Sequence, residues 1–142
     1  MIKETITYVD YDGNKRTEDH YFNLSKAELT ELQMSKKGGF HSYLTRIMSS
    51  NDTPEIMSVF KEIITMSYGR KSDDGRRFIK NNELLEDFLQ SEAYTEFLMK
   101  IIGEEGEAAK FINGLMPSDL MSEIEKMGGP EKAMEAIKNG KA

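Results

Sequence analysis

The strongest helix signal in the chain lies in the stretch NDTPEIMSVFKEIITMSYG, residues 51–69. It predicts a long and largely apolar helix, around which the rest of the fold is expected to pack. Asp52 or Thr53 can cap its start, Pro54 suits its first turn, and Gly69 suits its end. Apolar side chains cover more than one face, which is typical of a helix at the centre of a fold. These side chains belong to Ile56, Met57, Phe60, Ile63, Ile64 and Met66.

The chain before this helix predicts a β-hairpin. Ile2, Ile6 and Tyr8 alternate with polar residues, Asp12-Gly13 is a typical turn, and a second alternating run follows it. Two strands alone are marginally stable in water. We therefore expect the hairpin to pack on helices, to join a neighbouring chain, or both.

Two short helices are predicted between the hairpin and the central helix. In NLSKAEL, Ser25 and Glu28 have the spacing of a capping box, and Leu24 and Leu29 have that of a hydrophobic staple. This helix should end before Gly38-Gly39. The next follows in FHSYLTRIMSS, residues 40–50.

Three more helices are predicted after residue 80, in NNELLEDFLQ, in SEAYTEFLMKIIG with a Ser91 cap, and in EAAKFINGLM. The fold class is therefore mainly α (α+β): an N-terminal β-hairpin followed by a compact bundle of about five to seven short helices. We expect one domain over residues 1–117. Residues 118–142 are predicted to be a loosely attached helical tail that orders on a partner.

Composition narrows the possible functions. The chain has 142 residues, no cysteine and a formal net charge of −6. Thiol catalysis, disulfides and cysteine-based zinc sites are therefore excluded. The acidic balance disfavours nucleic acid or an anionic membrane as the main partner. No apolar run approaches the roughly 20 residues of a membrane span, and the N-terminus lacks the pattern of a signal peptide.

No motif predicts catalysis, a metal site or a cofactor. His20 and His41 lack the spacing of a helical zinc motif, and we expect both to have structural roles. Asp73-Asp74-Gly75 lacks the alternating ligands of a calcium loop. GEEGE, residues 103–107, lacks the lysine of a phosphate-binding loop. We therefore expect a protein that is not an enzyme.

One basic segment stands out, YGRKSDDGRRFIKN at residues 68–81. Between residues 70 and 80 it has five positive and two negative side chains, a net charge of +3. It could be a structural connection in which Asp73 and Asp74 pair with arginines while Phe78 and Ile79 anchor the chain. It could also be a docking loop for an acidic partner or a neighbouring subunit. The net charge of the protein opposes nucleic-acid binding. The basic residues are Arg70, Lys71, Arg76, Arg77 and Lys80.

Four stretches in order, FNLSKAEL, MSYGRKSDDGRRFIKN, SEAYTEFLMK and FINGLMP, resemble the tail assembly chaperones of long-tailed (siphovirus-type) bacteriophages. The resemblance covers residues 22–117. It implies a host-cytoplasmic assembly factor that coats the tape-measure protein, is displaced by tail-tube subunits and is absent from the mature virion. It implies no catalytic residue. Family members often have a longer product made by ribosomal frameshifting, and Gly140-Lys141 permits a slippery codon pair.

The resemblance and the apolar pattern suggest a client-binding or self-association face near the end of the last core helix. The alternative is that these side chains close the core. The residues are Phe111, Ile112, Leu115, Met116, Leu120 and Met121. Other functions remain open: a structural virion protein (a tail-completion or connector component), a small enzyme, or a cellular helical adaptor.

Overall fold

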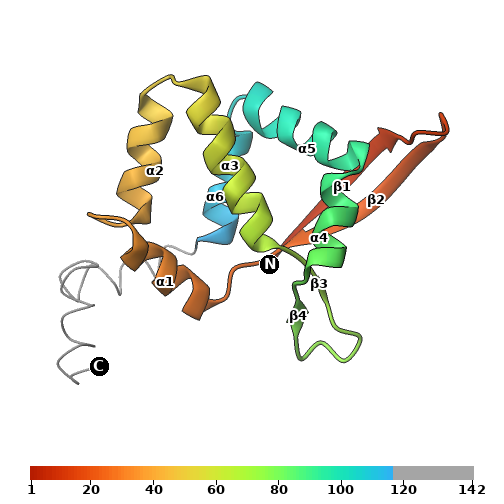
Figure 1. Cartoon of the computed structure of the whole chain (residues 1–142), viewed down its shortest axis with the longest axis horizontal. Helices are drawn as coiled ribbons and strands as arrows, with labels where there is room; N and C mark the ends of the chain where they lie inside the picture. Colours follow the sequence, from red (N-terminus) through yellow and green to blue (C-terminus); the bar gives the residue numbers. More distant parts are fainter. Residues whose placement is uncertain (117–142) are drawn as a thin grey trace. The chain divides into compact units, whose positions relative to one another are not determined.

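The computed structural model describes residues 1–116, apart from the side chain of His41. This part of the chain contains four strands and six helices (Figure 1). It forms two compact units, Met1–Asn23 with Phe60–Leu115, and Leu24–Val59 with Met116. The predicted mainly α fold with an N-terminal hairpin is confirmed. The division into a domain over 1–117 and a tail over 118–142 stays a prediction, since 117–142 lie outside the described residues.

The first unit begins with the predicted hairpin. β1 (Ile2–Val9) pairs antiparallel with β2 (Lys15–Phe22) over their whole length. Ile6 and Tyr8 are buried and their neighbours are exposed, as the alternation predicts. Asp10 holds the turn: its Oδ1 accepts hydrogen bonds from the amides of Asp12 (3.0 Å) and Asn14 (2.9 Å).

The sheet continues into two strands that the sequence does not predict. β3 (Tyr68–Lys71) pairs with the end of β2, Phe22 opposite Tyr68, and then with β4 (Phe78–Ile79). The sheet order is β1-β2-β3-β4. The segment expected to be a simple connection between helices is therefore itself a hairpin. Its pairing was missed because β3 and β4 are too short to show a period.

Helix α3 (Thr53–Ser67) ends two residues before the predicted Gly69. Ser67 is fully buried, and its hydroxyl donates to the carbonyl of Ile63 at 2.7 Å. The Ser67 carbonyl accepts from the amide of Asn23 at 2.8 Å. Ser67 thus ends α3, and its carbonyl already bonds to the residue that follows β2.

Helices α4 (Asn82–Leu89), α5 (Glu92–Gly103) and α6 (Glu107–Leu115) complete the first unit. Asn81 caps α4 by accepting from the amide of Leu84 at 2.9 Å. Ser91 occupies the N-cap position of α5, but the prediction that its side chain caps the helix is wrong. Its hydroxyl donates instead to the carbonyl of Phe88, in the last turn of α4, at 2.7 Å.

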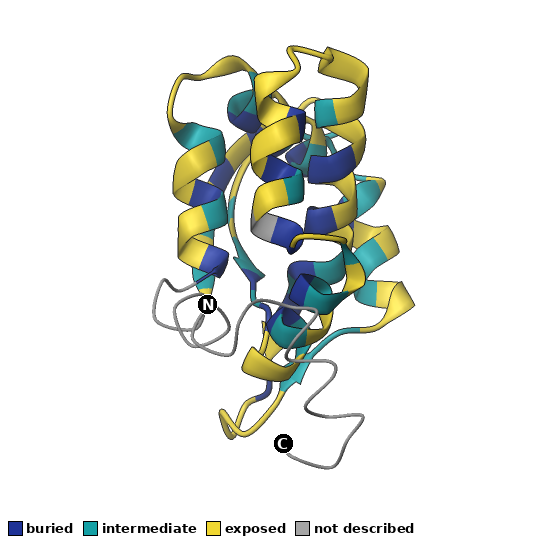
Figure 2. Ribbon diagram, turned by 90° about the vertical axis from the view of Figure 1, so that its left-hand side faces the viewer, coloured by how far each residue is buried: buried dark blue, intermediate teal, exposed yellow. Residues whose placement is uncertain are grey.

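An aromatic cluster forms the core of the first unit. Phe22 stacks on Phe97, with ring centroids 4.9 Å apart, and meets Phe111 and Phe88 edge-on. Such ring pairs contribute about 0.5–1.5 kcal/mol each beyond their buried area. Buried and exposed residues alternate along each helix in Figure 2. On α5, for example, one side carries the buried Ala93, Phe97 and Ile101.

The second unit contains α1 (Lys26–Ser35), α2 (Phe40–Ser49) and the start of α3. The predicted capping box is present: the amide of Glu28 donates to the Ser25 hydroxyl, and the amide of Ser25 donates to the Glu28 carboxylate. Leu24 and Leu29 are buried, as the staple predicts. Of the two candidate caps for α3, Asp52 accepts from the amide of Glu55 at 3.3 Å.

Candidate functional site

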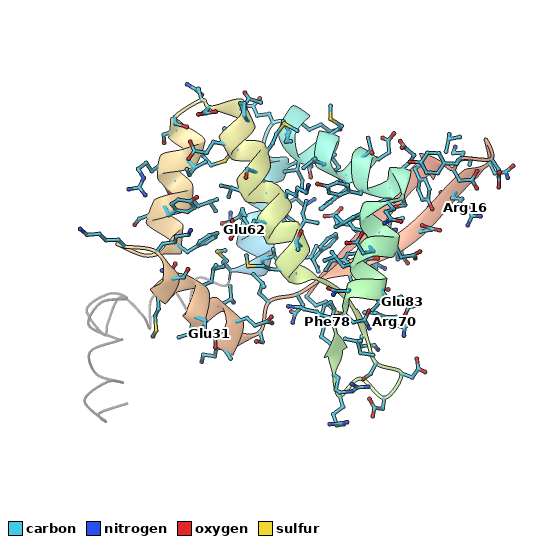
Figure 3. The ribbon with its side chains drawn as sticks, viewed as in Figure 1. Arg16, Glu31, Glu62, Arg70, Phe78 and Glu83 are labelled. Atoms are coloured by element: carbon cyan, nitrogen blue, oxygen red, sulfur yellow. The ribbon has the colours of Figure 1, made fainter. Side chains whose placement is uncertain are left out.

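Strands β3 and β4, their loop and Lys80 form a projection that we name the basic hairpin (residues 68–80; Figure 3). Ser72 closes the loop. Its amide donates to the carbonyl of Arg77 (2.8 Å), and its hydroxyl accepts from the Arg77 amide (3.0 Å) and donates to Asp74 (2.7 Å). The bond from Ser72, followed by one from the amide of Arg76, lowers the pKa of Asp74. The loop therefore has a defined hydrogen-bonded geometry.

Most of the positive charge on the basic hairpin faces solvent. Arg70, Lys71, Arg76 and Arg77 are exposed. Arg76 lies 3.9 Å from Asp74, and both side chains are well exposed, so the pair contributes little stability. Within residues 1–116, no ion pair involves the other three side chains or Asp73. The predicted pairing of aspartates with arginines is thus confirmed for Asp74 only.

The apolar residues of the basic hairpin are less exposed than its arginines. Phe78 and Ile79, expected to anchor the segment, are half-buried and form β4. Lys80 is half-buried as well, with Nζ 5.8 Å from the centroid of the Phe78 ring. Gly69 is buried beneath them, and a Cβ there would collide with the carbonyl of Ile79 and the ring of Phe78. The close approach of β3 and β4 therefore requires glycine at this position.

A second feature of the first unit was not expected from the sequence, a hollow of about 350 Å³ between the β1–β2 turn and the junction of α4 with α5. Tyr11 is one of its lining residues, and the Tyr11 hydroxyl donates to Glu92 at 2.9 Å, which raises the pKa of Tyr11. Four carboxylates and one guanidinium line it, a net charge of −3. We name it the acidic hollow, lined by Tyr8, Asp10, Tyr11, Asp12, Arg16, Asp87, Gln90, Ser91 and Glu92.

A second groove, of about 310 Å³, lies between β1 and α5. Lys100 lies within it, 3.5 Å from Glu4 and 3.7 Å from Glu107. Met99, at its rim, is 58% exposed. Its lining side chains include three carboxylates and one ammonium group, a net charge of −2, so it is less acidic than the acidic hollow with −3.

The predicted client-binding face is only partly at the surface. Phe111 and Leu115 are buried, and the Phe111 ring packs edge-on against Phe22 and Phe97. Ile112 is half-buried, and Met116 is 9% exposed. Leu120 and Met121 lie outside the described residues. The structure thus gives Phe111 and Leu115 a place in the core, while the binding role of the face stays a prediction.

His20 has the structural role that the sequence predicts. Its Nδ1 lies 2.9 Å from the Tyr68 hydroxyl, and its Nε2 lies 3.3 Å from Glu18. Burial lowers its pKa, opposed by the Glu18 carboxylate. Nowhere in residues 1–116 do three or more metal-ligating side chains gather.

The surface also carries exposed methionines: Met48 on α2, Met57 on α3 and Met99 on α5. Thioether side chains are flexible and polarizable, so they adapt to apolar partners of different shape. No helix within the described residues is long and apolar enough to cross a membrane. Together these features define a small α+β protein with charged and adaptable faces suited to binding other proteins.

The comparison with protein families agrees with this description. The family model described as phage tail assembly chaperone matches residues 1–141. The chain therefore belongs to the phage tail assembly chaperone family. Searches of the curated proteins and of the solved structures gave no match to this chain.

Proposed function

We propose that this chaperone binds the tape-measure protein without catalysis, keeps it soluble and recruits tail-tube subunits to it. It acts in the host cytoplasm, associates with further copies of itself, and is absent from the mature virion. Family membership over residues 1–141 is the observation that carries this proposal.

The surface chemistry supports such a role. A protein that shields an apolar client needs adaptable apolar contacts and enough charge to keep the complex in solution. Exposed methionines supply the first, and a chain with 31% charged residues and a net charge of −6 supplies the second.

The proposed client-binding surface lies at the end of α6. Phe111 packs against the ring of Phe97 and Leu115 is buried, so these two side chains position the surface and do not themselves meet the client. The contacts would come from Ile112, Met116, Leu120 and Met121. Apolar anchors spaced along a helix are a common means of recognising a partner helix.

Co-expression with the tape-measure protein from the same genome tests the proposal. The wild-type chaperone should keep the tape-measure protein soluble and co-purify with it. Replacing Met116 and Met121 by Asp should abolish this rescue, because a carboxylate opposes an apolar contact. Circular dichroism would confirm that the double variant remains folded. The single variant Met121→Asp provides a second test that does not place a charge at the buried Met116.

Val9→Asp provides the control, since it introduces a carboxylate at an exposed apolar residue of β1, outside the proposed surface. It should leave client rescue unchanged. A folded Met116→Asp/Met121→Asp variant that rescues fully would rule out this surface. If mass spectrometry finds the chain in purified virions, a structural tail component becomes the better description.

A longer frameshifted product forms part of the same proposal. The codons of Gly140-Lys141, which lie outside the described residues, would form the slippery site. Their nucleotide sequence and a search for the longer product by mass spectrometry test this directly.

A further inference from the structure

The basic hairpin and the acidic hollow belong to the same unit but point in different directions. In Figure 1 the β3–β4 hairpin extends below α4, whereas the turn of the β1–β2 hairpin extends to the right. Figure 3 places Arg70 and Phe78 on the first projection and Arg16 near the second. The two surfaces therefore do not neutralise each other within one chain.

Their charges are complementary. The hairpin carries a net charge of +3 between residues 70 and 80, and the side chains lining the hollow carry −3. Within the described part of the chain, Arg70, Lys71 and Arg77 have no ion-pair partner. Oppositely charged surfaces of this kind steer association and set its orientation.

The hollow also has the right chemistry for guanidinium groups. Tyr11 is 78% exposed, so its ring offers a face on which an arginine can stack. Asp12 and Asp87 make no hydrogen bond or ion pair through their carboxylates among residues 1–116, and carboxylates bind arginine through paired hydrogen bonds. A volume of about 350 Å³ leaves room for long side chains.

We propose that the basic hairpin of one copy docks in the acidic hollow of a second copy. The inference rests on the proposed function, in which the chaperone self-associates, and it identifies the two surfaces that meet. Because they are different patches, the contact is head-to-tail, and each bound pair of copies leaves one hairpin and one hollow open. Such contacts extend as a row of subunits, which suits an elongated client.

The hydrogen-bonded loop supports this use of the hairpin. Ser72, Asp74 and the amides of Arg76 and Arg77 hold the loop in one conformation. Less conformational entropy is then lost when the arginines dock. Nucleic acid would also attract the hairpin, but a chain of net charge −6 opposes it.

Charge reversal tests the contact. One variant carries Arg76→Glu and Arg77→Glu, and the other carries Asp12→Lys and Asp87→Lys. Light scattering over a concentration series should show that wild-type association weakens as salt is raised. Each variant alone should associate more than about tenfold more weakly than wild type. An equimolar mixture of the two should associate again, because the reversed charges match.

The matched control is Lys61→Glu with Lys110→Glu, which makes the same charge change at two exposed lysines of α3 and α6. It should associate as wild type does. The inference is overturned if wild type stays monomeric, if both variants associate normally, if the mixture fails to associate, or if nuclease dissolves the assemblies.

Tape-measure solubility is measured separately on the same variants. Charge-dependent association without any client rescue by wild type would count against the proposed function alone. Client rescue with a mixture that never associates would count against the head-to-tail contact alone.

Discussion

The ring of Tyr68 stacks on the ring of Phe88, with centroids 4.3 Å apart and planes 7° from parallel. Tyr68 begins β3, and Phe88 lies in α4, the helix that follows β4. The pair therefore joins the start of the basic hairpin to the helix that follows it. His20 packs on the same Phe88 ring, and its Nδ1 is hydrogen-bonded to the Tyr68 hydroxyl. The root of the hairpin is thus held by the aromatic core.

Truncating Phe88 should destabilise the protein strongly. Phe88 is 2% exposed and contacts four aromatic rings besides its backbone neighbours, so Phe88→Ala removes packing and leaves a cavity. We expect a loss of about 3–5 kcal/mol in the free energy of unfolding. Tyr68→Phe, which keeps the stacked ring and removes one hydrogen bond, should cost about 0.5–1.5 kcal/mol. Urea unfolding would compare them, and equal losses would contradict the importance of the stack.

Gly69→Ala should loosen the pairing of β3 with β4. The added methyl group meets the Ile79 carbonyl, a backbone atom that cannot move aside cheaply. We expect a loss of about 1–3 kcal/mol in stability, the usual cost of overpacking. Hydrogen exchange at the amides of β3 should become faster.

Gly103→Ala is the matched control for that substitution. A Cβ at Gly103, the last residue of α5, meets nothing within 4 Å. The change should be neutral or slightly stabilising, because alanine restricts the unfolded chain. If the two alanine variants behave alike, the close approach at Gly69 does not limit stability.

Much of the fold follows from local sequence signals. The alternation around Ile6 and Tyr8, the turn at Gly13 and the capping box at Ser25 each act within a few residues, so their consequences can be read directly. The six helices were predictable for the same reason. The prediction of a Ser91 side-chain cap was wrong because its hydroxyl donates to the carbonyl of Phe88, in the preceding helix.

The missed features depend on residues far apart in the chain. β3 is a strand because Tyr68 and Gly69 lie beside Phe22 and Tyr21, a pairing that no local period reveals. The acidic hollow joins the β1–β2 turn to α4 and α5, and its Tyr11–Glu92 hydrogen bond spans 81 residues. Likewise, the apolar pattern of α6 shows that Phe111 is on one face, but only the fold shows that this face meets Phe22 and Phe97.

Removing the α1 cap should weaken the second unit. Ser25→Ala leaves the amide of Glu28 without its side-chain acceptor, whereas the backbone amide of residue 25 can still donate to the Glu28 carboxylate. We expect a loss of about 0.5–2 kcal/mol in the free energy of unfolding. Ser25→Asp keeps an acceptor and adds a negative charge at the helix N-terminus, so it should retain wild-type stability. Denaturant titration followed by circular dichroism measures both, and an equal loss would show that the cap is unimportant.

Alkaline pH should destabilise the fold partly through Tyr68. Burial, reinforced by Asp87 and Glu18, raises the pKa of Tyr68 to about 12, against about 10 in an unfolded chain. Above pH 10 the unfolded state therefore releases this proton while the folded state keeps it, so stability falls as the pH rises. The contribution of Tyr68 is fully present below pH 10 and is lost as the pH passes 12. Tyr68→Phe, which cannot ionise, should show a shallower fall in unfolding free energy between these values. When tyrosine ionisation is followed by absorbance, the Tyr68→Phe variant should lack the group that titrates near pH 12. Identical titration curves for the variant and the wild type would contradict the raised pKa of Tyr68.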